Sequence, residues 1–102
     1  MNDHSAHLNR RLDRRVPLGC TAAIQLPHGE RIPAQCLELS VSGMTLHAAY
    51  VPGRGEVLEV AVAPPEGAVD RPPLVAKLEV KRCNALGGGL YEIGGAIVRI
   101  VN

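Results

Sequence analysis

The residues best suited to chemistry are arginines crowded near the N-terminus. Four of the 11 Lys and Arg residues of this 102-residue chain are Arg10, Arg11, Arg14 and Arg15. A guanidinium group is always charged and presents five N–H donors in a flat fork, which suits phosphate oxygens and the O6 and N7 atoms of guanine. Because the net charge of the chain is only +1, anion recognition has to come from such a local cluster rather than from a global positive field.

A second group with complementary chemistry lies in the stretch "ELSVSG", which contains Glu38, Ser40 and Gly43. Carboxylate oxygens accept hydrogen bonds from N1–H and N2–H of guanine, and a glycine allows the backbone to approach a ligand closely. Strand alternation predicts that Glu38 and Ser40 point outward, on the same face as Cys36, while the leucines on either side of Glu38 face the core. The arginine segment is therefore expected to fold back and meet Glu38 and Ser40 on the outer surface.

The elements that must position these groups are strands, because apolar residues recur mostly with a period of two. The predicted strands span residues 18–26, 32–40, 44–51, 56–63, 74–83 and 90–101. A proline-rich loop, "PPEGAVDRPP", separates the fourth strand from the fifth, and "NALGGG" is predicted as a hairpin loop before the sixth. The Gly94-Gly95 pair inside the last strand suggests a bulge or a tight bend.

Six strands with short turns bury one apolar face by closing on themselves, so an all-β, six-stranded antiparallel barrel is expected. Residues 18–102 would form this single barrel, and residues 1–17 would form a flexible N-terminal arm. The barrel core is expected to be aliphatic, since two tyrosines are the only aromatic residues. This scarcity of stacking aromatics makes single-stranded nucleic acid a weak candidate for the ligand.

The two polar groups together resemble the signature of the PilZ domain family, whose members are bacterial receptors for cyclic di-GMP. That signature is RxxxR in an N-terminal loop, followed by [D/N]xSxxG. Here "RLDRR" supplies Arg11 and Arg15, and "ELSVSG" aligns as Glu38, Ser40 and Gly43. The segment "YEIGGAIVRI" is similar to the closing strand of the family, so the resemblance extends over about residues 10–101.

The resemblance implies a six-stranded barrel that binds cyclic di-GMP, with Arg11 and Arg15 as the principal ligands. It also implies that a basic residue before the motif, here Arg10, accompanies binding of a stacked ligand dimer, and Arg14 is an additional candidate for a phosphate contact. An alternative frame pairs Arg10 with Arg14. The arm would become ordered over the ligand and create a surface for a downstream effector protein.

The chain departs from the family signature at Glu38, where the pattern has Asp or Asn. Glutamate keeps both acceptor oxygens, but its extra methylene moves them by about one C–C bond, and binding sites tolerate displacements of only ~0.5 Å. We expect weakened or rearranged binding. The alternative is a PilZ-like adaptor that binds proteins and has little or no affinity for nucleotides, and a weaker third hypothesis is a basic-tailed barrel that binds nucleic acid.

The remaining chemistry-bearing residues suggest no enzyme, no metal site and no cofactor. Cys20, Cys36 and Cys83 are an odd number without metal-like spacing, and we expect them to be buried free thiols. Arg82 and Arg99 are expected as surface charges within reach of the ligand. A cytoplasmic protein without membrane insertion is expected, because neither a signal peptide nor a run of 18 apolar residues occurs.

Overall fold

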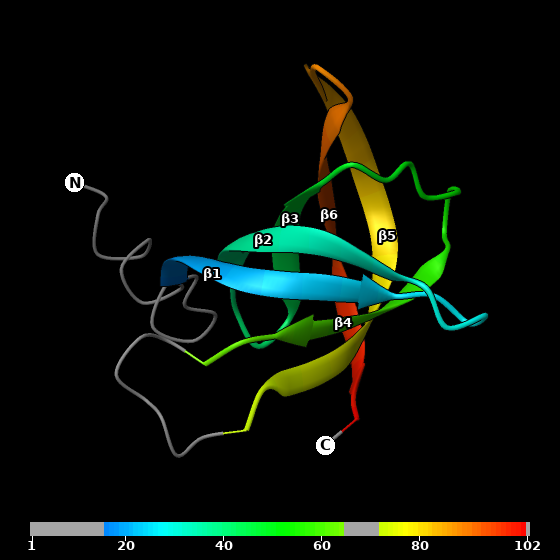
Figure 1. Cartoon of the computed structure of the whole chain (residues 1–102). Helices are drawn as coiled ribbons and strands as arrows, with labels where there is room; N and C mark the ends of the chain where they lie inside the picture. Colours follow the sequence, from blue (N-terminus) through cyan, green and yellow to red (C-terminus); the bar gives the residue numbers. More distant parts are fainter. Residues whose placement is uncertain (1–15, 65–71, 102) are drawn as a thin grey trace.

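The computed structural model describes residues 16–64 and 72–101, which form a closed barrel of six antiparallel strands (Figure 1). The strands are β1 (Val16–Gln25), β2 (Arg31–Leu39), β3 (Gly43–Ala48), β4 (Val57–Val62), β5 (Leu74–Gly87) and β6 (Leu90–Ile100). This confirms the all-β, six-stranded barrel predicted from the sequence. The described ranges contain no helix, and therefore none that is long and apolar enough to cross a membrane.

The order of the strands around the barrel is β1-β2-β3-β6-β5-β4, and β4 closes the barrel on β1. The series is therefore not a simple meander, because β3 pairs with β6 rather than with β4, its successor in the sequence. This crossover matters for function, since it brings the start of β3 beside the middle of β6. Residues 43–48 pair antiparallel with residues 91–96 along their whole length.

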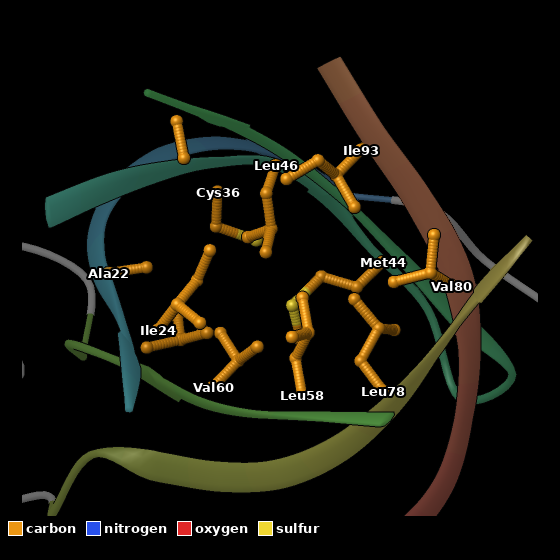
Figure 2. Close-up of a cluster of buried hydrophobic side chains, with 12 residues drawn as sticks. Ala22, Ile24, Cys36, Met44, Leu46, Leu58, Val60, Leu78, Val80 and Ile93 are labelled. Atoms are coloured by element: carbon orange, nitrogen blue, oxygen red, sulfur yellow. The ribbon is translucent and has the colours of Figure 1, made fainter. Parts of the chain in front are cut away.

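The core follows from the alternation of apolar residues along the strands. Leu58, Val60 and Val62 of β4 are buried, as are Ala76, Leu78 and Val80 of β5, which are the inward faces that the sequence predicts. Figure 2 shows Leu58, Val60, Leu78 and Val80 together with side chains from the remaining strands inside the barrel. Burying a large aliphatic side chain contributes roughly 1.5–3 kcal/mol, so this aliphatic cluster is the main source of stability.

The hairpin between β5 and β6 is longer than the sequence suggests. The expected loop at residues 84–89 is mostly strand, because β5 continues to Gly87 and β6 begins at Leu90. Gly87, Gly88 and Gly89 all have positive φ, which is the conformation that a tight reversal requires and that glycine adopts without strain. The far part of this hairpin is exposed and projects beyond the barrel (Figure 1).

The connection from β3 to β4 is fastened by one carboxylate. Glu56 accepts hydrogen bonds from the Tyr50 hydroxyl at 2.8 Å and from the Gly53 backbone N–H at 2.7 Å. The hydrogen bond to Glu56 raises the pKa of Tyr50, because it stabilises the protonated phenol. The connection, which carries Arg54, is thereby held in a defined conformation beside β5.

Candidate ligand-binding site

A cavity of about 220 Å³ lies on the outside of the barrel where β2, β3, β5 and β6 come together. Its wall combines one acidic residue, two basic residues and several residues with small side chains. The lining residues are Glu38, Leu39, Ser42, Gly43, Met44, Thr45, Lys81, Arg82, Gly94, Gly95 and Ala96. Of the residues that the sequence singled out for the ligand, Glu38 and Gly43 therefore lie in one cavity.

The position of Glu38 depends on a bulge in β2. Cys36 pairs with Leu46, but Glu38 pairs with Thr45, so Leu37 is an extra residue in β2. Such a bulge shifts the alternation of side chains between the two faces. Cys36 is consequently buried in the core, and the expectation that it shares the outer face with Glu38 was wrong. Glu38 itself is half-buried in the cavity wall.

Ser40 is buried, with 7% of its surface exposed, whereas the sequence predicted an outward-facing side chain. Its hydroxyl oxygen accepts hydrogen bonds from the backbone N–H groups of Gly43 at 3.1 Å and Ser42 at 3.3 Å. The Ser40 N–H donates in turn to the Gly43 carbonyl at 2.9 Å and closes the turn between β2 and β3. No described residue other than glycine has a positive φ, so this short connection is not one of the primed turns that hairpins favour. Instead, the Ser40 hydroxyl stabilises the turn by accepting hydrogen bonds from its backbone N–H groups.

Three glycines allow close packing around the cavity: Gly43 and Gly95 against neighbouring backbone, and Gly94 against the Arg82 side chain. A Cβ on Gly43 would lie 2.8 Å from the carbonyl oxygen of Gly95, and a Cβ on Gly95 would collide with the carbonyl oxygen of Glu79. None of Gly43, Gly94 and Gly95 has a positive φ, so close packing rather than backbone conformation requires glycine there. The predicted bulge is present, but the extra residue is Lys81 in β5, opposite Gly94 and Gly95.

The basic wall of the cavity comes from β5. Arg82 Nη1 donates to Glu92 Oε2 at 2.9 Å, and His47 Nε2 lies 3.0 Å from the other oxygen, Glu92 Oε1. Both hydrogen bonds lower the pKa of Glu92, and the one with His47 has the larger effect. Lys81 Nζ lies 3.4 Å from Glu79 Oε1. The sequence analysis assigned no role to Lys81 and expected Arg82 to be a surface charge within reach of the ligand. The Gly94-Gly95 pair was the available signal for their placement.

The four arginines of the N-terminal cluster lie outside the described residues. The chain is described from Val16, and Val16 pairs with Leu39 while Pro17 pairs with Glu38. Arg15 is covalently joined to Val16, and consecutive Cα atoms lie about 3.8 Å apart. The RxxxR motif is therefore attached to the barrel directly beside two residues that line the cavity.

Other chemistry is sparse in residues 16–64 and 72–101. These ranges contain no group of three or more His, Cys, Asp or Glu side chains that could hold a metal ion. All three cysteines are free, but only Cys36 is buried, while Cys20 and Cys83 are half-buried. Burial raises the pKa of the Cys36 thiol to about 11, so this thiol is protonated and a poor nucleophile at neutral pH.

Comparison with known proteins finds similarity among solved structures. No family model matches the chain, and no curated protein matches it. Among solved structures, the chain is similar to the Bacillus subtilis inhibitor of motility, MotI/DgrA, with a TM-score of 0.69 and 20% sequence identity. The alignment covers 90% of this chain and 44% of MotI/DgrA, so the chain spans less than half the length of that protein. The similarity shows a shared fold.

Proposed function

We propose that this chain is a cyclic di-GMP-binding receptor or adaptor in bacterial second-messenger signalling, and that the N-terminal segment becomes ordered over the ligand. The sequence placed the end of this segment at residue 17, but β1 already begins at Val16, so the segment proposed to become ordered is residues 1–15. The pairing of Val16 with Leu39 and of Pro17 with Glu38 carries the proposal. It joins a segment rich in guanidinium groups to a cavity whose wall holds a carboxylate and closely packed glycine backbone. The resemblance to the PilZ signature and the fold shared with MotI/DgrA support the same function.

The proposed roles follow from the chemistry of each group. Arg11 and Arg15 bind guanine O6 and N7 and phosphate oxygens, and Glu38 accepts from guanine N1–H and N2–H. Gly43 lets the ligand approach the backbone, and Ser40 holds the turn that presents Gly43. Arg10 contacts the second nucleotide of a stacked ligand dimer, and Arg14 provides a further phosphate contact.

The size of the cavity agrees with a ligand that is bound partly by the barrel and partly by the N-terminal segment. Its volume of about 220 Å³ is below the ~300–1,000 Å³ of pockets that enclose a drug-sized ligand. The cavity suits one base or one phosphate group rather than a whole dinucleotide. Another segment has to cover the rest of the ligand, which is the role proposed for the residues that precede β1.

Calorimetric titration with cyclic di-GMP tests the proposal. The wild-type chain should bind saturably, and Arg15→Ala should weaken binding by about tenfold or more, because one bidentate arginine contact is worth ~1–3 kcal/mol. Arg31→Ala is a matched control, since Arg31 is an exposed arginine at the start of β2 that does not line the cavity. Absence of binding to the wild type, or equal losses for both variants, would refute the proposal.

The same titration examines two finer points. Glu38→Asp should tighten binding if the extra methylene of Glu38 misplaces the carboxylate, and unchanged or weaker binding would contradict that reasoning. A stoichiometry of two ligands per chain would support the stacked dimer and the role of Arg10. One ligand per chain would exclude it.

The second candidate is a PilZ-like adaptor that binds a protein and has weak or no affinity for nucleotides. Glu38 favours it, because the signature has Asp or Asn at that position. An apolar surface next to the cavity also favours it, since Val41 and Ile100, which border a hollow with Leu39 and Ile97, are 79% and 48% exposed. Absence of heat with cyclic di-GMP from both wild type and Glu38→Asp would favour this adaptor over the receptor.

A further inference from the structure

A β-bulge sends two consecutive cationic side chains to the outer face of the barrel. Val80 pairs with Gly95 and Arg82 pairs with Gly94, which leaves Lys81 as the extra residue of β5. In regular alternation one of two neighbouring side chains would point inward, but here Val80 is buried and both Lys81 and Arg82 are exposed. The bulge therefore concentrates positive charge at one point of the sheet.

The guanidinium group of Arg82 lies directly over Gly94. A Cβ built on Gly94 would be 2.8 Å from both Cζ and Nε of Arg82, which is too close for any real side chain. Since the φ of Gly94 is not positive, the backbone conformation does not call for glycine. The absence of a side chain at position 94 is what allows the guanidinium group to occupy this place.

Glu92 fixes the orientation of Arg82 from the neighbouring strand. Its carboxylate receives a hydrogen bond from Arg82 Nη1 at 2.9 Å and is held at its other oxygen by His47 Nε2 at 3.0 Å. One of the five N–H donors of Arg82 is directed at Glu92, and the side chain lines the cavity with donors that this contact does not use. Arg82 is thus held in place without being fully neutralised.

Cations gather where two cavities meet. Lys81 and Arg82 line the cavity described above and also a second one of about 230 Å³, whose other lining residues include Arg54 from the connection between β3 and β4. Acidic groups lie nearby as well, since Glu38 lines the first cavity and Glu79 contacts Lys81. A ligand with more than one negative charge, such as a nucleotide with two phosphate groups, matches this distribution.

We infer that Arg82 is an anion-binding residue of this cavity, positioned by Gly94 and Glu92, and that it binds a phosphate oxygen of the nucleotide ligand. The identity of that ligand as cyclic di-GMP rests on the proposed function. The recognition of a phosphate group by Arg82 rests on the geometry of β5 and β6. Arg82 adds a fixed cation from the barrel to those that the N-terminal segment carries.

The test compares three variants: one removes the charge of Arg82, one keeps the charge but replaces the guanidinium group, and one only displaces the guanidinium group. Arg82→Ala should weaken cyclic di-GMP binding by about ten- to a hundredfold, and Arg82→Lys should restore it only in part, because lysine lacks the fork. Gly94→Ala keeps the charge but pushes the guanidinium group aside, so it should weaken binding by about three- to tenfold. Arg31→Ala, an exposed arginine of β2 that does not line the cavity, is the matched control and should stay within about twofold, since its effect is limited to long-range charge. The thermal midpoints should stay near that of the wild type. Unchanged affinity of Arg82→Ala or Gly94→Ala would overturn the inference.

A second measurement separates this inference from the proposed function. Inorganic pyrophosphate is titrated into the wild-type chain while the side-chain Nε–H signals of the arginines are followed by NMR. A saturable shift of the Arg82 signal that Gly94→Ala reduces would support the inference even if cyclic di-GMP does not bind. The inference would be overturned if neither pyrophosphate nor cyclic di-GMP shifts the Arg82 signal, whether or not cyclic di-GMP binds elsewhere on the chain.

Discussion

Replacement of Ser40 by alanine should reveal that its hydroxyl group is a structural part of the turn between β2 and β3. The change removes the acceptor for the N–H groups of Gly43 at 3.1 Å and Ser42 at 3.3 Å, at a site with 7% exposure. One net hydrogen bond contributes about 0.5–1.5 kcal/mol, and a buried N–H left without a partner costs about 1–3 kcal/mol. With one well-placed and one longer bond, we expect a loss of about 1–3 kcal/mol in the free energy of unfolding. For a domain of this size each kcal/mol lowers Tm by about 4–8 °C.

Thermal and urea denaturation, each followed by circular dichroism, measure this loss. Ser40→Thr is the rescue variant, because it keeps the acceptor oxygen and the apolar hollow beside Ser40, about 410 Å³ in volume, has room for the added methyl group. The threonine variant should recover most of the lost stability. An alanine variant within about 0.5 kcal/mol of the wild type, or a threonine variant as unstable as alanine, would refute the structural role of the hydroxyl.

Three further predictions concern single groups around the core and the site. Gly43→Ala should lower the free energy of unfolding in urea by about 1–3 kcal/mol, because its Cβ would meet the Gly95 carbonyl oxygen at 2.8 Å, and no loss would contradict this packing. The Cys36 thiol, whose pKa burial raises to about 11, should react with a thiol reagent at pH 8 much more slowly than the other two cysteines, and equal rates would contradict its burial. The pKa of Glu92, lowered by His47 and by the arginine beside it, should fall below the ordinary ~4.3 in a carbon-13 titration. A depressed folded-state pKa stabilises the fold above the unfolded value, so this contribution should disappear as pH falls through the folded pKa, and a midpoint at or above ~4.3 would contradict it.

The strands and the core could be predicted from the sequence because apolar residues recur mostly with a period of two, most clearly in β4 and β5. The residues predicted to face inward on β4 and β5 are all buried, from Leu58 to Val62 and from Ala76 to Val80, although Ala61 is buried as well. The closed barrel follows from the need to bury those faces. Local pattern thus sufficed wherever the strands are regular.

The site could be predicted only in part because bulges decide which way its side chains point. The extra residue Leu37 places Cys36 in the core, and the extra residue Lys81 sends Arg82 outward beside Gly94. A bulge depends on how two strands pair, and β5 and β6 are joined by a hairpin whose register the sequence alone did not fix. The pairing of β3 with β6 is likewise a property of closure, and it is what brings Gly43 to Gly95.

The most direct test of the whole account is an NMR map of backbone amide shifts when cyclic di-GMP is added to the wild-type chain. We expect the largest shifts at Gly43, Arg82 and Gly94, which line one cavity, and little change at Gly29 and Gly55, which lie in turns that do not line it. Arg15→Ala should reduce the shifts at the cavity residues, and no new shifts should arise at other residues. No saturable shifts, or shifts centred on Gly29 or Gly55, would contradict the claim that this cavity binds the nucleotide.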